Sequence, residues 1–81
     1  MRIKVSFFAV LREIAGVAQA ELDLPEGCTV GVLKQAILSD FPQLAGGMES
    51  AIVAIDQAAS EPDRLIAPDM DISIFPPIAG G

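Results

Sequence analysis

One segment in the middle of this 81-residue chain has the periodicity of an amphipathic helix. Its apolar residues recur at spacings of three and four, so they fall on one helical face. Thr29 can cap the first turn, and Pro42 ends the helix because proline forces the preceding residue out of the helical region. One such helix can cover one face of a sheet. The apolar positions are Val30, Leu33, Ile37 and Phe41.

Two segments before this helix alternate between apolar and polar residues, as strands with one buried face do. They are residues 2–9 and residues 18–24, and the second stops at Pro25. Residues 10–15 between them predict a short helical turn that ends at Gly16, since glycine accepts the left-handed conformation of a helix cap. The two strands are therefore expected to form a hairpin with a wide connection.

Three further strands are predicted after the main helix. Residues 51–55 form the continuous apolar run typical of a central strand buried on both faces. A tight turn at Asp56-Gln57 leads into a short return strand at residues 58–60, and residues 71–75 are the last strand. We expect a two-layer α+β domain of about five strands in which the first and last strands lie parallel at the centre, as in a β-grasp arrangement.

Two aromatic residues fall on the side opposite their strands' regular apolar positions. Phe8 lies in the first predicted strand and Phe75 ends the last, and no predicted helix covers that side of the sheet. They are expected to form an exposed apolar patch that binds a partner. The alternative is that both rings pack beneath the loops at residues 43–50 or 62–71.

Composition excludes several functions. Eleven acidic and five basic residues give a net charge of −6, so nucleic acid and anionic membranes would repel the chain and a basic partner surface is expected. There is no histidine for catalysis or metal binding. The lone Cys28 cannot form an intramolecular disulfide, which suits the cytoplasm, and is expected to be buried. Acidic residues at 61–71 lack the spacing of a calcium loop and are expected to be solvated.

The C-terminal segment, residues 76–81, is expected to leave the domain formed by residues 1–75. Its sequence is Pro76-Pro77-Ile78-Ala79-Gly80-Gly81. The prolines cannot continue strand pairing and favour a stiff extended form, and the two glycines fit a channel too narrow for any Cβ atom. Extended, six residues reach roughly 20 Å, enough to carry the Gly81 carboxylate into a neighbouring active site. A frayed terminus is the alternative from composition alone.

The chain resembles the MoaD-type sulfur carriers, the small subunits of molybdopterin synthase, over its whole length. The resemblance is carried by the opening Val5-Ser6-Phe7-Phe8-Ala9 with Leu11-Arg12-Glu13-Ile14-Ala15-Gly16, by Ala54-Ile55-Asp56-Gln57, and by the ending Phe75-Pro76-Pro77-Ile78-Ala79-Gly80-Gly81. Two loop positions depart from the family pattern. Met70 stands between two acidic residues where glycine is usual, and Asp56 stands where asparagine is common.

The resemblance implies a ubiquitin-like β-grasp fold with a flexible Gly-Gly tail, and a cycle of acyl activation at that tail. An E1-like adenylating enzyme would use ATP and Mg²⁺ to activate Gly81, and a persulfide donor would convert it to a thiocarboxylate. The tail would then donate sulfur to cyclic pyranopterin monophosphate to form the molybdopterin dithiolene. The chain itself would be a non-catalytic subunit, binding no cofactor and active only with the large subunit in a heterotetramer.

In this interpretation Gly81 and Gly80 are the reactive end, and the partner-binding residues are Phe8, Phe75, Pro76, Pro77, Ile78 and Ala79. Two other functions would share the fold and the tail. One is a sulfur carrier for thiamine or tRNA thiolation, and the other is a ubiquitin-like protein modifier joined to lysine amines.

Overall fold

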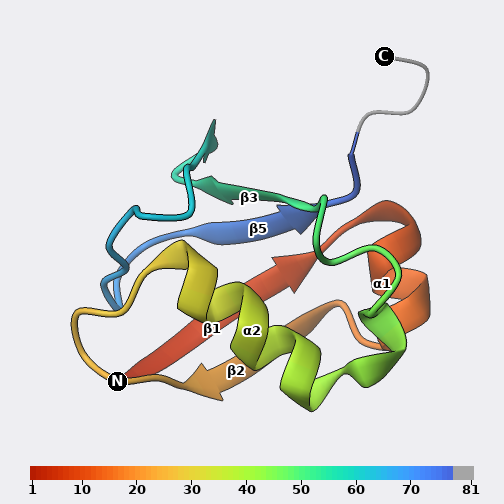
Figure 1. Ribbon diagram of the computed structural model, residues 1–81, viewed down its shortest axis with the longest axis horizontal. Helices are drawn as coiled ribbons and strands as arrows, with labels where there is room; N and C mark the ends of the chain where they lie inside the picture. Colours follow the sequence, from red (N-terminus) through yellow and green to blue (C-terminus); the bar gives the residue numbers. More distant parts are fainter. Residues whose placement is uncertain (78–81) are drawn as a thin grey trace.

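The computed structural model describes residues 1–77 as a mixed sheet of five strands with helix α2 across one face (Figure 1). The predicted α+β class is confirmed. The elements in chain order are β1 (Arg2–Phe7), α1 (Ala9–Ala15), β2 (Gln19–Asp23), α2 (Val30–Asp40), the 3₁₀ helix η1 (Pro42–Leu44), β3 (Ile52–Ile55), β4 (Ala58–Ala59) and β5 (Ile72–Phe75).

The first and last strands lie side by side at the centre of the sheet. The strand order is β2-β1-β5-β3-β4, with β1 and β5 parallel and the other neighbouring pairs antiparallel. Val5 lies opposite Ile72, and Phe7 lies opposite Ile74. A parallel pair needs a crossover connection, which here is the rest of the chain with α2 in it. The predicted β-grasp arrangement and the β1–β2 hairpin are both confirmed.

The alternation in β1 places one set of its side chains in the core. Ile3, Val5 and Phe7 are almost completely buried. The Phe7 ring meets the ring of Phe41 edge to face, with centroids 5.4 Å apart. Because Phe41 follows the last turn of α2, this contact fixes the end of the helix against the middle of the sheet.

Helix α2 has the predicted boundaries. The Thr29 hydroxyl oxygen accepts a hydrogen bond from the Val32 N–H at 3.4 Å, which satisfies one of the free donors of the first turn. Leu33 and Ile37 are fully buried against the sheet. Phe41 leaves the helical conformation immediately before Pro42, as the steric effect of proline requires.

Turns with left-handed backbone connect several elements. Gly16 caps α1 with φ 82°, as predicted. Asp56 and Gln57, with φ 51° and 72°, form the tight β3–β4 turn, in agreement with the expected return strand. Ala9 also has a positive φ, 55°, which is uncommon for a residue with a Cβ atom.

Two details of the predicted strands are wrong. The first strand ends at Phe7, not at residue 9, because the backbone reverses at Ala9 to begin α1. The strand at residues 52–55 is not central, since it lies between β5 and the two-residue β4. Its apolar run has another cause: Val53 and Ile55 belong to the buried core, while Ile52 on the opposite side is half-buried next to Phe75.

No helix within residues 1–77 combines the length and the apolar character needed to cross a membrane.

Candidate functional site

The strand β5 delivers the chain to one end of the sheet, where it meets the end of β1. The parallel register pairs Phe7 with Ile74, and the Phe8 N–H donates to the Ile74 carbonyl oxygen at 3.1 Å. One residue beyond this pair, Phe8, which follows β1, and Phe75, the last residue of β5, come side by side. Both lie on the sheet face opposite α2, because their neighbours Phe7 and Ile74 are the buried residues.

The rings of Phe8 and Phe75 stack on each other. Their centroids are 4.7 Å apart and the ring planes differ by 13°. Phe8 remains 39% exposed and Phe75 37% exposed, so neither ring packs beneath the loops at residues 43–50 or 62–71. The stack is an exposed apolar patch at the end of β5, and an exposed patch of stacked aromatic rings is suited to binding another protein. The partner-binding role given to these two residues stays a prediction.

The sheet face that carries this stack, which we call the open face, changes in character along the strands. Ile52 lies opposite Phe75 in the β3–β5 register and extends the apolar end. In the next row the residues at the centre of the sheet are small: Ser6 pairs with Ser73, and Ser73 pairs with Ala54. At the edge of this row Gln19 pairs with Ser6. The apolar end of the open face therefore gives way, at the centre of the sheet, to small side chains that a flat partner surface could approach closely.

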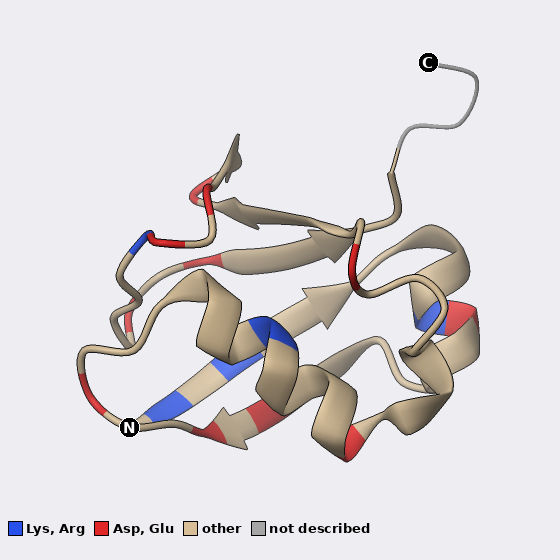
Figure 2. Ribbon diagram, in the orientation of Figure 1, with Lys and Arg blue, Asp and Glu red and all other residues tan. Residues whose placement is uncertain are grey.

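The far end of the open face is charged (Figure 2). The Arg2 Nε lies 2.8 Å from Glu21 Oε2, and its Nη1 lies 3.3 Å from Asp23 Oδ1. The hydrogen bond from Arg2, with its positive charge, lowers the pKa of Glu21, and the same contact raises the pKa of Arg2. These groups are at the start of β1, roughly 20 Å from Phe8 at a strand rise of about 3.3 Å per residue. Within residues 1–77, both ion pairs lie at this end of the face.

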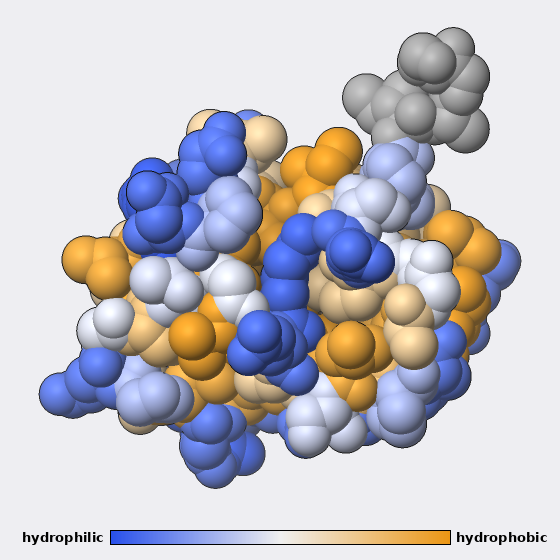
Figure 3. Space-filling view, viewed as in Figure 1, coloured by the Kyte–Doolittle hydropathy of each residue, from blue (hydrophilic) through white to orange (hydrophobic). Residues whose placement is uncertain are grey.

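The chain turns away from pairing directly after the stack. Phe75 is the last residue of β5, and Pro76 and Pro77 lie outside any strand, with Pro76 half-buried and Pro77 exposed. In Figure 3, apolar surface lies on either side of the base of this segment, with hydrophilic surface in front of it. Four predicted site residues, Ile78, Ala79, Gly80 and Gly81, lie outside the described residues.

Sequence reasoning missed the exposed apolar residues of α1. Val10 is 47% exposed and Ile14 43% exposed, and they lie one helical turn apart on the outer face of α1. Their spacing of four could have indicated this, but a helix of seven residues is too short for a clear periodicity. Cys28 is buried in the turn before α2, as expected, and its carbonyl oxygen accepts from the Ile66 N–H.

The fold and the exposed aromatic end define the class of protein. A mixed sheet with parallel β1 and β5 at its centre and one helix across it is the ubiquitin-like β-grasp fold. The chain belongs to the ThiS family, which matches residues 5–81.

Individual relatives agree with this membership. The chain is 35% identical over 83 residues to the molybdopterin synthase sulfur carrier subunit of Chlamydomonas reinhardtii, with all of both chains covered. It also resembles the structure of SAMP1, a small archaeal modifier protein of Haloferax volcanii, with TM-score 0.84, 25% identity and full coverage of both chains. In a complex of subunits 1 and 2 of the molybdopterin-converting factor from Helicobacter pylori, one chain shares the fold, with TM-score 0.68, 20% identity and full coverage of both chains.

Proposed function

We propose that this chain is the sulfur carrier subunit of a molybdopterin synthase, with the Gly81 carboxylate as the group that carries sulfur. The observation that carries the proposal is the position of β5. The last strand is central in the sheet and ends beside the exposed Phe8–Phe75 stack, so the segment that follows leaves the domain next to a surface suited to docking. Family membership and the named relatives support the same function.

The body of the domain holds the partner while the C-terminal segment reaches its active site. The stack and Ile52 form the docking end of the open face, and Pro76-Pro77 direct the chain away from β5. Two prolines restrict the backbone before binding, which reduces the entropy lost when the segment enters a channel. Gly80 and Gly81 then pass where a side chain would clash.

The chemistry begins with activation of the carboxylate. A carboxylate repels nucleophiles, and transfer of AMP from ATP by an E1-like enzyme with Mg²⁺ removes that charge and supplies a leaving group. The terminal sulfur of a persulfide donor attacks the acyl carbon and expels AMP. A thiol then cleaves the resulting acyl disulfide, leaving a thiocarboxylate on Gly81 and a disulfide on the donor.

The thiocarboxylate is the reagent of the last step. The large subunit binds the C-terminal segment, and the ionised sulfur attacks cyclic pyranopterin monophosphate, favoured by the effective molarity of a positioned nucleophile. Water then hydrolyses the resulting thioester, which leaves the sulfur on the substrate and returns the Gly81 carboxylate, and a dithiolene needs two such transfers. Binding of the substrate phosphate falls to the large subunit, because this chain has no histidine and only five basic residues. We propose a heterotetramer with one copy of this chain at each end of a large-subunit dimer, acting in the cytoplasm.

One experiment tests this function against its alternatives. The protein is incubated with an adenylating enzyme, ATP, Mg²⁺ and a persulfide donor, and its intact mass is measured. Replacement of OH by SH at the C-terminus adds about 16 Da, as expected for a covalent thiocarboxylate intermediate. Transfer to cyclic pyranopterin monophosphate is then followed with the large subunit. Gain of sulfur without transfer would indicate another thiolation pathway.

The likeness to SAMP1 favours a second candidate, a protein modifier. In that case the same incubation with cell extract would join Gly81 to lysine amines, detected as isopeptide-linked peptides. Matched controls are a chain that lacks Gly81 and a chain with one extra residue after it. Neither should take up sulfur, because activation needs a free carboxylate at a fixed reach. Sulfur uptake by either control contradicts the proposal.

A further inference from the structure

A groove lies on the side of the C-terminal segment away from the open face. It has a volume of about 290 Å³ and runs between α1 and the loop that follows η1. Its lining comes from Val10, Leu11 and Ile14 of α1, from η1 and the loop after it, and from Pro76 and Pro77. The base of the C-terminal segment is therefore one wall of the groove.

The other walls of the groove are held by packing and a hydrogen bond. Leu11 and Leu44 are buried and form its floor, with 2% and 1% of their surfaces exposed. The Gln43 side-chain amide donates to the Ala15 carbonyl oxygen at 3.4 Å, which ties η1 to the end of α1. A groove with fixed walls loses little entropy when it is filled.

The chemistry of the lining selects an aliphatic occupant. None of the lining residues is charged, although one residue in five of this chain is charged. The exposed parts of Val10 and Ile14 give the rim an apolar edge of branched side chains. A volume of this size accommodates one or two aliphatic side chains, and a charged group would lose its hydration there without a partner.

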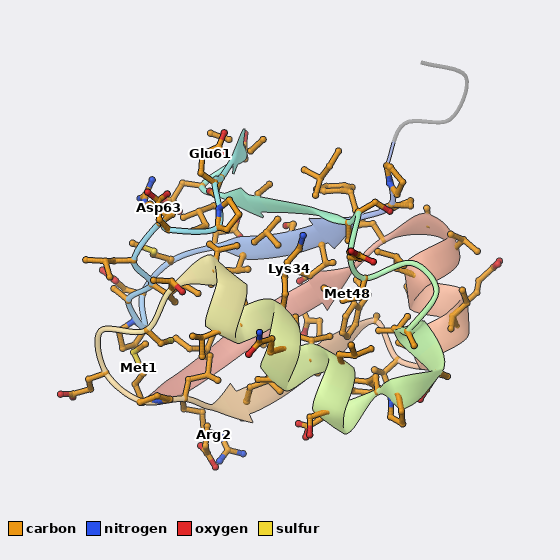
Figure 4. The ribbon with its side chains drawn as sticks, in the orientation of Figure 1. Met1, Arg2, Lys34, Met48, Glu61 and Asp63 are labelled. Carbon is orange, nitrogen blue, oxygen red and sulfur yellow. The ribbon has the colours of Figure 1, made fainter. Side chains whose placement is uncertain are left out.

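Another hollow on the same molecule lacks these features. It has a volume of about 400 Å³ and lies along α2, where Lys34 reaches toward the loop after η1 (Figure 4). The Lys34 Nζ donates to the Glu49 carbonyl oxygen at 3.3 Å, so a charged side chain crosses its rim. Pro76 and Pro77 are not part of its lining, so a protein that holds the C-terminal segment need not approach it.

The groove beside Pro76-Pro77 differs because these two prolines form part of its wall, so an enzyme that contacts the base of the C-terminal segment also comes close to the groove. Pro76 follows Phe75 directly, so the Phe8–Phe75 stack and the groove flank the same two prolines. Ala9 alone separates Phe8 of the stack from Val10 on the rim of the groove. The two apolar surfaces are therefore adjacent along the chain.

We propose that this groove is a second docking site, which receives an aliphatic side chain from the large subunit when that subunit binds the C-terminal segment. The inference rests on the proposed function and adds to it. The partner holds Pro76-Pro77 from both sides, with the aromatic stack on one side and the groove on the other. Contact on two sides fixes the direction in which the segment leaves the domain, which contact with the open face alone does not.

The test compares two variants that place a carboxylate at matched positions. Val10→Glu puts a charge on the rim of the groove, in the first turn of α1, where an acidic residue is compatible with the helix. Val32→Glu is the control, since Val32 is 39% exposed in the first turn of α2, away from the groove. The Kd of each full-length protein for the large subunit is measured by calorimetry, and its fold by circular dichroism.

We expect Val10→Glu to weaken binding by about tenfold or more, because the charge must be desolvated, and Val32→Glu to bind like wild type. Ile14→Glu is the second variant if Val10→Glu unfolds, and Ile14→Leu should retain binding. The inference is overturned if the groove variants bind within about a factor of two of wild type, or if Val32→Glu is weakened equally. Failure of the wild-type protein to bind the large subunit would instead overturn the proposed function.

Discussion

Replacing Phe75 with alanine removes one ring of the exposed stack and should weaken binding to the large subunit. A phenylalanine side chain offers on the order of 200 Å² of apolar surface. Phe75 is 37% exposed, which leaves roughly 75 Å² for a partner to cover. At about 25 cal/mol per Å² this area contributes up to about 2 kcal/mol, or about a 30-fold increase in Kd on its removal.

The part of the Phe75 side chain that is already buried in the folded protein contributes to the free energy of unfolding rather than to binding. It amounts to roughly 125 Å², so the variant should lose at most about 3 kcal/mol of unfolding free energy, and less because the unfolded chain is itself partly compact. Binding must therefore be measured well below the midpoint of thermal unfolding. Phe8→Ala should behave similarly, and the double variant should lose less stability than the sum by about 0.5–1.5 kcal/mol, the coupling of a stacked pair.

Calorimetric titration with the large subunit and urea unfolding measure the two effects separately. Val32→Ala is the control, because Val32 has similar exposure on α2, which covers the opposite face of the sheet. A Phe75→Ala protein that loses stability but keeps the wild-type Kd would refute the reasoning. Such a result would mean that the exposed edge of the ring meets only solvent in the complex.

Two further predictions concern the fold. Gly16→Ala should lower the free energy of unfolding by about 1–2 kcal/mol in urea, because the Gly16 φ of 82° is unfavourable for alanine and the added Cβ would meet no atom within 4 Å. Gly16→Asn should cost less, since asparagine tolerates this conformation better. An unchanged urea midpoint for Gly16→Ala would contradict the prediction. The pKa of Glu21, measured by NMR titration, should be lower than that of an ordinary glutamate. Either Arg2→Gln or high salt should return this pKa toward the ordinary value. The small stabilising effect of the Glu21 carboxylate is present above its pKa in the unfolded chain and is lost as the pH falls through its pKa in the folded protein. A normal Glu21 pKa at low salt would show that the ion pair with Arg2 is absent.

Local interactions explain why much of the fold could be predicted. Helix α2 is specified by its own periodicity, by a cap at Thr29 and by a stop at Pro42, all within a dozen or so residues. The Gly16 cap and the Asp56-Gln57 turn are likewise decided by backbone preferences of single residues. The apolar run at residues 51–55 predicts a central strand, but the strand lies next to the edge strand β4. An apolar run indicates that residues are buried, but it does not indicate which element covers them.

The candidate site divides in the same way. By itself, the sequence determined the ending Phe75-Pro76-Pro77, the acidic charge and the lack of histidine, because these are properties of composition and local conformation. The tertiary structure alone decided that Phe8 stacks on Phe75, and that Val10 and Ile14 face a groove beside the prolines. Contacts between opposite ends of the chain depend on strand order and register, which no local segment encodes.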